Sequence, residues 1–424
     1  MCVLSRQGPH GSGRLLVRTV AVPDPGDLLE PLPQPDVVAW VHHRAGLAGW
    51  GEAASVTLPA GEDRFTAGEK WLRSVFDAAD VDDQVRVRGS GPVAFGTFTF
   101  DASSDGSVLI VPRVVLGRDG RGGAWLTVVT EPGEAAPGWP VPAGPEPAAP
   151  RIVRWEDGGL PGPRWEQAVA EAVAAIKAGS LRKVVLARDV FGLADEAIDV
   201  RVLLRRLASR YPDCYTFACD GMVGATPELL VRRAGREVSA LVLGGTLPRG
   251  ADPAADLALG RELLASAKNN EEHAYAVDSV RDALGPLCAV FDVEARPSLL
   301  KFPNLQHLGS RIRGTLTDGQ AAKSALALAA AVHPPAAVCG TPAGAALDLI
   351  RELEQMDRER YAGPVGWVDA EGNGEWGIAI RSGQISGRTA RLFAGCGIVT
   401  GSEPRAELAE TLVKLQPMRG ALEG

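Results

Sequence analysis

Short apolar runs separated by glycine, aspartate and serine clusters dominate the first 130 residues. Runs of this length and spacing are typical of β-strands joined by turns. The strands expected from them are Val37–Val41, Gly49–Glu52, Val93–Phe100, Val108–Val115 and Ala124–Val129. One helix is expected at Asp63–Asp80. The pattern therefore predicts a β-rich N-terminal part.

From residue 151 onwards, helical and strand-like segments alternate. The clearest helix is Arg164–Ala178, which has one apolar face and ends at Gly179. The apolar side chains of that face are Trp165, Val169, Val173 and Ile176. Further helices are expected at Val200–Arg210, Asp256–Leu284 (as one helix or two), Gln320–Ala331 and Ala343–Asp357. Strands are expected at Lys183–Arg188, Cys214–Cys219, Gly221–Thr226, Pro227–Arg232, Ser239–Thr246 and Leu305–Thr315, and a proline-interrupted loop at His333–Pro342.

The stretch from Tyr361 to Lys414 combines a hairpin, a strand and a helix. Asn373-Gly374 predicts a hairpin turn, because both positions favour φ > 0. The flanking strands are expected at Gly366–Asp369 and Trp376–Ser382, a third strand at Arg391–Val399, and a helix after Gly401-Ser402. In that helix Glu407 and Glu410 are three residues apart and share one face. Two adjacent carboxylates repel each other unless a proton or cation lies between them, and Mg²⁺ prefers such oxygen ligands.

Residues 131–150 are crowded with proline, alanine and glycine, which predicts a surface connection. This connection is either a domain boundary or a long excursion between two halves of one fold. No internal repeat of fixed period is found that would divide the chain further.

Composition narrows the class of protein. The 424 residues are 46% hydrophobic and can bury a large core, and the net charge of −8 argues against a nucleic-acid partner. No apolar run approaches the length of a membrane helix, and the N-terminus lacks the apolar core of a signal peptide. The six cysteines are scattered without a Cys-x-x-Cys pair, so neither a zinc site nor a disulfide framework is indicated. We expect a reduced, cytoplasmic protein.

Each candidate chemical residue also has an ordinary structural interpretation. Lys183 opens an apolar strand, where a lysine reaching solvent is commoner than a catalytic base. Glu228 follows a proline at the start of a strand, and Glu272 is in a helix, where glutamate is usually a surface residue. Glu407 and Glu410 are also favoured near a helix N-terminus by the helix dipole. Taken singly, these signals predict only a large α/β protein.

Taken in order, the motifs resemble the chorismate-utilising enzyme family. The resemblance covers roughly residues 150–420, and its motifs are Lys183–Arg188, Ala225–Leu230, Gly244–Thr246, Glu272-His273, Gln306–Ser310, His333-Pro334, Gly340–Pro342, Tyr361–Gly363, Gly395–Val399 and Glu407…Glu410…Lys414. Within the family, Asp369–Trp376 and the His333–Pro342 segment are most similar to the isochorismate synthases.

The resemblance implies one α/β (α+β) domain over residues 1–424, with two large antiparallel sheets packed together and helices outside. In this interpretation residues 1–130 are a β-rich N-terminal part, 131–150 an excursion, and 151–420 the motif-bearing catalytic part. The expected substrate is chorismate, the expected cofactor Mg²⁺, and the expected state a monomer.

The resemblance also implies a role for each site residue. Isochorismate synthases add water at C2 of chorismate while the C4 hydroxyl leaves. Lys183 matches the family's base, which must be neutral to accept a proton, and Glu228 matches its general acid, whose pKa must be raised. Glu272, Glu407 and Glu410 match the Mg²⁺ ligands. The expected substrate-binding positions are Gly245, Thr246, His307, Ala337, Tyr361, Arg381, Gly395, Gly397 and Lys414.

Several functions remain as alternatives. Anthranilate and aminodeoxychorismate synthases typically have Gln where Lys183 stands, so Lys183 argues against them. Salicylate synthases, which go on to eliminate pyruvate, tend to have Thr where Ala337 stands, so Ala337 favours isochorismate as the final product. A non-catalytic chorismate-binding protein would have lost at least one of the matched acidic or basic residues, and an unrelated metal-binding structural protein would make the motif order a coincidence. Isochorismate could feed menaquinone or siderophore biosynthesis.

Overall fold

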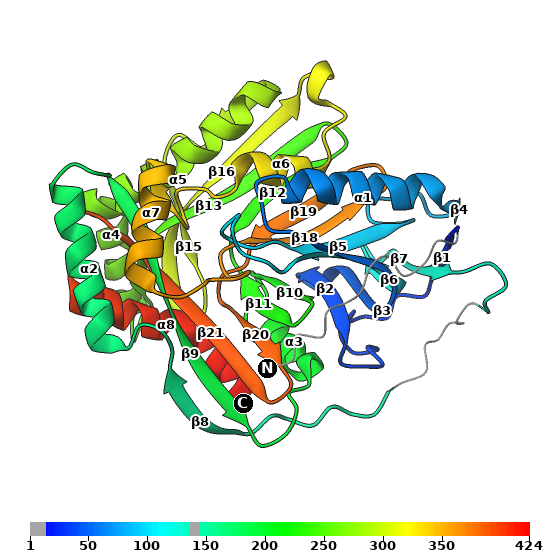
Figure 1. Ribbon diagram of the computed structural model, residues 1–424, viewed down its shortest axis with the longest axis horizontal. Coiled ribbons are helices and arrows are strands. Elements are labelled where there is room, and N and C mark those ends of the chain that lie inside the picture. The colour runs from blue at the N-terminus through cyan, green and yellow to red at the C-terminus, as the bar shows by residue number, and fades with distance from the viewer. Residues whose placement is uncertain (1–13, 136–143) are drawn as a thin grey trace.

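Antiparallel strand pairing dominates residues 14–135 and 144–424, the residues that the computed structural model describes (Figure 1). The strands of the N-terminal part are β1 (Leu16–Val22), β2 (Val37–His42), β3 (Ala45–Leu58), β4 (Asp80–Asp83), β5 (Val93–Thr97), β6 (Ser107–Arg118) and β7 (Ala124–Thr130). Those of the rest are β8 (Ile152–Asp157), β9 (Lys183–Ala194), β10 (Tyr215–Cys219), β11 (Met222–Thr226), β12 (Leu229–Ala234), β13 (Glu237–Pro248), β14 (Cys288–Val293), β15 (Ser298–Lys301), β16 (Leu305–Leu316), β17 (Gly340–Thr341), β18 (Pro364–Asp369), β19 (Gly374–Ile378), β20 (Ser382–Ser386) and β21 (Thr389–Ile398).

The strands form two large sheets, as predicted, and the two sheets are joined through β6. One sheet runs β4-β1-β7-β6-β3-β2-β10-β11-β20-β21-β9-β8. The other runs β5-β18-β19-β12-β13-β16, with β14 and β15 on the far side of β16. Strand β6 is long enough to pair with β7 through its second half and with β5 through its first half. Only β1–β4 is parallel among the described pairs.

Strands from the first 130 residues are built into the same sheets as the motif-bearing part. Strand β2 pairs with β10, and β5 pairs with β18. Of the predicted connection at 131–150, residues 136–143 lie outside the described residues, and 144–150 form no helix or strand. The N-terminal segment, which was predicted not to be a signal peptide, also lies largely outside the described residues.

The helices lie on the outside of the sheets. They are α1 (Arg64–Ala78), α2 (Gly162–Lys177), α3 (Val200–Arg210), α4 (Pro253–Ala265), α5 (Ala267–Leu284), α6 (Ala325–Val332), α7 (Ala343–Glu354) and α8 (Pro404–Glu423), with short 3₁₀ turns at Gly285–Leu287 and Asp318–Gln320. Helices α2 and α7 flank β9, while α6 packs on β18 and β19 and also contacts α1 (Figure 1). The predicted apolar face of α2 is buried.

The core is divided by the sheets into two apolar clusters. The larger contains Trp165, Phe95 and Trp376 and extends across both sheets. The smaller lies where α3 and α8 pack on the first sheet, and includes Leu203, Leu207 and Leu422.

Of the two alternatives for Asp256–Leu284, the structure has two helices, because the Ser266 side chain accepts a hydrogen bond from Asn269 N and starts α5. Two other predicted elements needed correction. The prediction that Asn373-Gly374 is the hairpin turn was wrong: Gly372 has the positive φ, and the Asn373 amide binds Asp369. The strand expected at Trp376–Ser382 ends at Ile378, and Ser382 instead begins a separate strand, β20, directly after Arg381, which has a φ of 52°.

Other differences concern missed or shortened elements. The helix expected at Gln320–Ala331 begins only after Ser324, whose side chain caps it. Strands β1, β4, β8, β14, β15, β17 and β20 were not predicted, and β17 lies in the segment expected to be a proline-interrupted loop. Four of these, β4, β8, β14 and β15, carry mostly exposed or half-buried residues, so their sequences lack a strong apolar signal.

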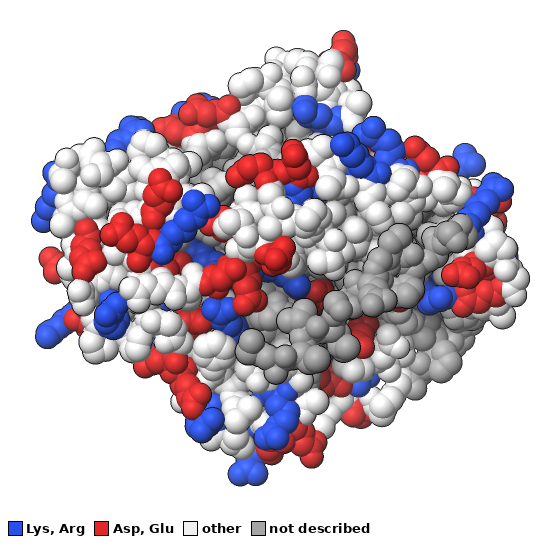
Figure 2. Space-filling model, viewed as in Figure 1, with Lys and Arg blue, Asp and Glu red and all other residues white. Residues whose placement is uncertain are grey.

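The surface carries acidic and basic side chains interspersed on the face shown in Figure 2. Among residues 14–135 and 144–424, no helix combines the length and apolarity needed to cross a membrane. No disulfide joins the described cysteines, which are Cys214, Cys219, Cys288, Cys339 and Cys396.

Candidate active site

A narrow cavity of about 60 Å³ lies where β9 and β21 of one sheet approach β13, β16 and α5 of the other. Eleven of the predicted site residues line it: Glu228, Gly245, Thr246, Glu272, His307, Ala337, Tyr361, Arg381, Gly395, Gly397 and Lys414. The other three predicted residues, Lys183, Glu407 and Glu410, contact this lining directly or through one neighbour. The fold thus brings together residues that are up to 231 positions apart, from 183 to 414.

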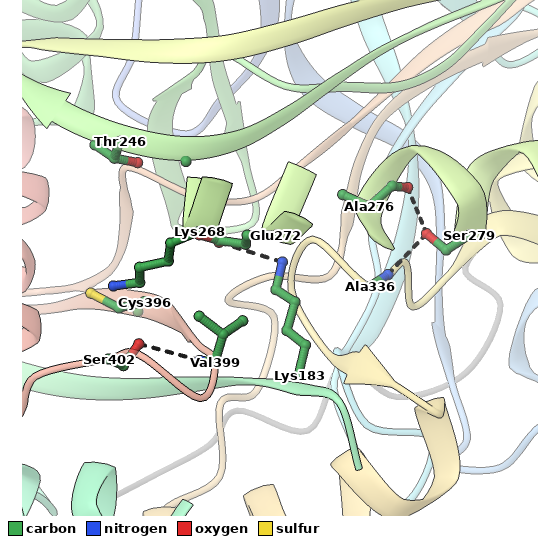
Figure 3. A network of polar contacts seen from close by, with 12 residues as sticks. Lys183, Thr246, Lys268, Glu272, Ala276, Ser279, Ala336, Cys396, Val399 and Ser402 are labelled. Atoms are coloured by element: carbon green, nitrogen blue, oxygen red, sulfur yellow. Dashed lines mark hydrogen bonds and ion pairs between the residues drawn. The ribbon is translucent and has the colours of Figure 1, made fainter. Parts of the chain in front are cut away.

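Lys183 is buried at the start of β9, and its side chain is 1% exposed. Its Nζ lies 3.4 Å from Glu272 Oε1 on α5 (Figure 3). Gly397 on the adjacent β21 makes room for this pair, because a Cβ there would lie 2.2 Å from Glu272 Oε1 and 3.0 Å from Lys183 Cε. Any larger residue at position 397 would therefore displace the Lys183 or Glu272 side chain from this contact.

Glu228 lies in the short turn between β11 and β12 and is buried. Its backbone N–H donates to Thr226 Oγ1 at 3.2 Å, which fixes the turn. Burial raises the pKa of the Glu228 carboxyl to about 7, although the charges of Lys183, Arg381 and Lys414 act to lower it. The carboxyl is therefore protonated in a substantial fraction of molecules near neutral pH, as a proton donor must be.

A β-bulge in β13 lets α5 approach the cavity. The register with β16 shifts between Gly244 and Thr246, and Gly245 has φ +65°. A Cβ on Gly244 would lie 2.8 Å from His273 Cα, and one on Gly245 would lie 2.8 Å from Asn269 Cβ. Side chains at either position would push α5, and with it Glu272, away from the site.

His307 on β16 holds Arg381 at one end of the cavity. Burial lowers the pKa of His307 well below its usual value, so the ring is neutral. Its Nε2 accepts from Arg381 Nη2 at 3.3 Å, while its Nδ1 lies 3.0 Å from Thr246 Oγ1 and 3.3 Å from the Gly245 carbonyl oxygen. The ring therefore orients a guanidinium that can bind a carboxylate.

Tyr361 completes this end of the cavity. Its ring stacks on Phe393 with 4.9 Å between centroids. Burial raises the pKa of its phenol, so the hydroxyl keeps its proton and can donate a hydrogen bond.

Helix α8 brings two carboxylates beside β21. Ligand atoms of Glu407, Glu410 and Cys396 lie within 4.8 Å of one another. Burial and the nearby Glu410 raise the pKa of Glu407. Each carboxylate is also paired with a lysine: Lys268 Nζ is 3.1 Å from Glu407, and Lys414 Nζ is 2.5 Å from Glu410 and donates to the Gly395 carbonyl oxygen at 2.8 Å.

This donor set fits a hard divalent cation. Glu407 and Glu410 supply two adjacent carboxylates in a partly buried place, where a cation relieves their repulsion. The sulfur of Cys396 is not a ligand type that Mg²⁺ prefers. Glu272 lies on the Lys183 side of the same cavity, outside this close group.

The loop after α6 places Ala337 and Val338 on the cavity wall. Ala336 N donates to Ser279 Oγ at 3.1 Å, and Ser279 Oγ donates to the Ala276 carbonyl oxygen at 2.8 Å (Figure 3). Arg358 Nη1 donates to the Val338 carbonyl oxygen at 2.9 Å. The backbone that carries Ala337 is thus held from two sides.

Sequence reasoning missed the apolar part of the lining and one cation. The apolar residues are Val185, Leu243, Val338 and Ile380. Val185 could have been found, because it is two residues from Lys183 and so faces the same side of the strand. Lys268 could also have been found, because it precedes Glu272 by one helical turn.

Comparisons with known proteins identify the family of this chain. A family model described as "Chorismate binding enzyme" matches residues 147–423. Isochorismate synthase DhbC of Bacillus subtilis is 42% identical over 275 residues, which cover 62% of this chain and 69% of DhbC. Isochorismate synthase MenF of the same bacterium is 40% identical over 264 residues, which cover 61% of this chain and 55% of MenF.

A solved structure extends the likeness to the whole fold. MenF, the menaquinone-specific isochorismate synthase from Escherichia coli, is similar with a TM-score of 0.79 at 25% identity, over 99% of this chain and 96% of that one. The residues matched by the family model include every position of the candidate site, from Lys183 to Lys414.

Proposed function

This chain belongs to the chorismate-binding enzyme family, and on that premise we propose that it is an isochorismate synthase. The proposed reaction adds water at C2 of chorismate and releases the C4 hydroxyl. The observation that carries the proposal is a buried lysine and a buried carboxyl of raised pKa at one cavity, Lys183 and Glu228.

The two residues divide the proton transfers between them. We propose that Lys183, in its neutral form, takes a proton from the attacking water as the new C2–O bond forms. Glu228 gives its proton to the departing C4 oxygen, which leaves as water. One water is consumed and one released, so the reaction is an isomerisation. The raised pKa of Glu228 supports its role, because a carboxyl of ordinary pKa would be ionised at neutral pH and could not donate.

The substrate carboxylates would be bound by the two cationic ends of the site. We propose that Arg381, oriented by His307, and Tyr361 hold the enolpyruvyl carboxylate. Gly245, Thr246, Gly395 and Gly397 bring backbone close to the ring, and Lys414 lies nearby.

Glu407, Glu410 and Glu272 are the residues proposed to hold Mg²⁺. When bound, this cation would neutralise the ring carboxylate of chorismate. The close approach of Glu407 and Glu410 supports the assignment. Glu272 need not bind the ion directly, because Mg²⁺ usually keeps several waters.

Ala337 supports isochorismate as the final product. It lies on the cavity wall, at the position where salicylate synthases tend to have Thr. Isochorismate would then feed menaquinone or siderophore biosynthesis. We also propose that the enzyme is a monomer.

The proposal is tested with the purified full chain, chorismate and Mg²⁺, without ammonia or coupling enzymes, with products separated by chromatography. Isochorismate in equilibrium with chorismate, without pyruvate, is the expected result. Salicylate with pyruvate would instead assign the second elimination step to this chain. No conversion by protein that still binds chorismate would contradict the proposal and favour a binding protein.

A further inference from the structure

We propose that Lys268 competes with the divalent cation for Glu407 and so sets the metal affinity of the site. This inference rests on the proposed function in one respect, the assignment of Glu407 and Glu410 as metal ligands. It assigns to Lys268 a role in tuning that affinity, not in the chemistry.

Each of the three proposed metal-binding glutamates has a lysine close to it. The pairs are Glu272 with Lys183 at 3.4 Å, Glu407 with Lys268 at 3.1 Å and Glu410 with Lys414 at 2.5 Å. The ammonium groups of Lys268 and Lys414 therefore already neutralise Glu407 and Glu410, the two carboxylates of the close group. A cation that binds there must replace at least one of these ion pairs or share a carboxylate with it.

Burial decides which lysine can be replaced. The side chains of Lys183 and Lys414 are 1% and 10% exposed, whereas that of Lys268 is 40% exposed. Lys414 is also held by the Gly395 carbonyl oxygen. The Lys268 side chain can rotate away from Glu407 into solvent at little cost, because it is long and flexible and water then hydrates its ammonium group.

The position of Lys268 on α5 places it at the metal side of the cavity. It precedes Glu272 by four residues, so both side chains project from the same face of the helix (Figure 3). Glu407 is 5% exposed, so its attraction to the Lys268 ammonium is less screened than in a surface pair. An ammonium at this distance from Glu407 repels any second cation bound to the same carboxylate.

The test is a calorimetric Mg²⁺ titration of the metal-stripped full chain at pH 8, where protons compete less with the metal. We expect Lys268→Ala to bind Mg²⁺ about threefold to tenfold more tightly, in line with the strength of a partly exposed ion pair. Lys268→Arg keeps the charge and should stay within about twofold of wild type. Lys70→Ala, which removes an exposed lysine on α1, is the matched control and should bind as wild type.

Thermal unfolding provides a second readout without turnover. Without metal, Lys268→Ala should melt at a lower temperature than wild type. Its Glu407 carboxylate lies beside Glu410 and no longer has the Lys268 ammonium group to offset their repulsion. Saturating Mg²⁺ should raise its melting temperature by more than that of wild type.

Unchanged or weaker Mg²⁺ binding by Lys268→Ala would overturn the inference. Glu410→Gln separates this failure from a wrong metal site: weakened binding supports the ligand assignment, while unchanged binding removes both the assignment and the role of Lys268. Neither readout uses chorismate, so failure of the product assay leaves the test intact.

Discussion

At the scale of single residues, Lys183 is the sharpest test of the chemistry. It is buried and contacts Glu272, so its replacement removes the proposed base without opening the surface. We expect Lys183→Ala to lower kcat by about 10²–10⁴-fold, the usual contribution of a general base, with chorismate and Mg²⁺ binding largely kept. Steady-state kinetics and a binding titration measure the two effects. Lys177→Ala, on the exposed end of α2, is the control, and retained activity in Lys183→Ala would remove Lys183 from the base role.

Glu228 makes a prediction about pH. Its pKa is raised to about 7 by burial, and the proton-donating form is the active one. The alkaline limb of the pH–activity profile should therefore be set by Glu228. Activity should be highest below about pH 7 and should fall about tenfold for each pH unit above pH 7. The check is kcat/KM measured from pH 6 to pH 9, because this ratio reports the pKa values of the free enzyme.

Two variants connect that alkaline limb to the carboxyl. Glu228→Gln should lose about 10²–10⁴-fold in kcat, because an amide cannot donate this proton. Glu228→Asp should keep part of the activity and a descending limb. A profile that is flat above pH 7 in wild type would count against Glu228 as the acid.

At the scale of elements, the site depends on how closely α5, β13 and β21 approach one another. Glycines at the contacts allow this approach, and Gly397 is the tightest of them, next to Lys183 and Glu272. The sequence showed a glycine-rich strand here but did not show which side chain it had to accommodate. That partner, Glu272, comes from a helix 125 residues earlier, from 272 to 397.

Gly397→Ala should therefore damage catalysis more than folding. The added Cβ would lie 2.2 Å from Glu272 Oε1 and would displace the contact with Lys183. We expect kcat/KM to fall by about 10²-fold, the effect expected when a side chain at the site is misplaced by about 1 Å. The free energy of unfolding should fall by about 1–3 kcal/mol. Gly401→Ala, where no atom lies within 4 Å of the new Cβ, is the control. Equal activity of the two variants would show that the Lys183–Glu272 spacing does not matter.

At the scale of the whole molecule, Asp369 ties the N-terminal part to the motif-bearing part. Its Oδ2 accepts from Gly89 N at 3.2 Å, and its Oδ1 accepts from Asn373 N at 2.8 Å. Burial raises its pKa from 3.8 to about 6. The folded state therefore holds this proton more tightly than the unfolded chain, so the stabilisation is complete below pH 3.8 and is lost as pH rises through 6.

Asp369→Asn should remove this pH dependence. Relative to the variant, wild type should lose up to about 3 kcal/mol of unfolding free energy between pH 4 and pH 7, the value of a shift of about two pKa units. Urea unfolding of both proteins at several pH values measures the difference. A difference that stays constant across this range would contradict the raised pKa of Asp369.

The sequence by itself determined most of the elements and the family to which the chain belongs. Strong local signals located most strands and helices, such as the apolar face of α2 and the antiparallel pair of β18 and β19. The ordered motifs identified the family, and one cavity gathers most of the residues that those motifs indicated. These features were readable because apolar periodicity, turn residues and motif order are local properties of the chain.

Only the tertiary structure decided how the sheets join, which lysine faces which glutamate, and which carboxyl is desolvated. The junction at β6 depends on pairing with both β5 and β7, and the exposed strands β14 and β15 are held by β16 rather than by their own sequence. The raised pKa of Glu228 and the pairing of Lys268 with Glu407 arise from burial and from neighbours far away in sequence. Burial and long-range electrostatics depend on all the surrounding elements at once, so no single stretch of sequence contains them.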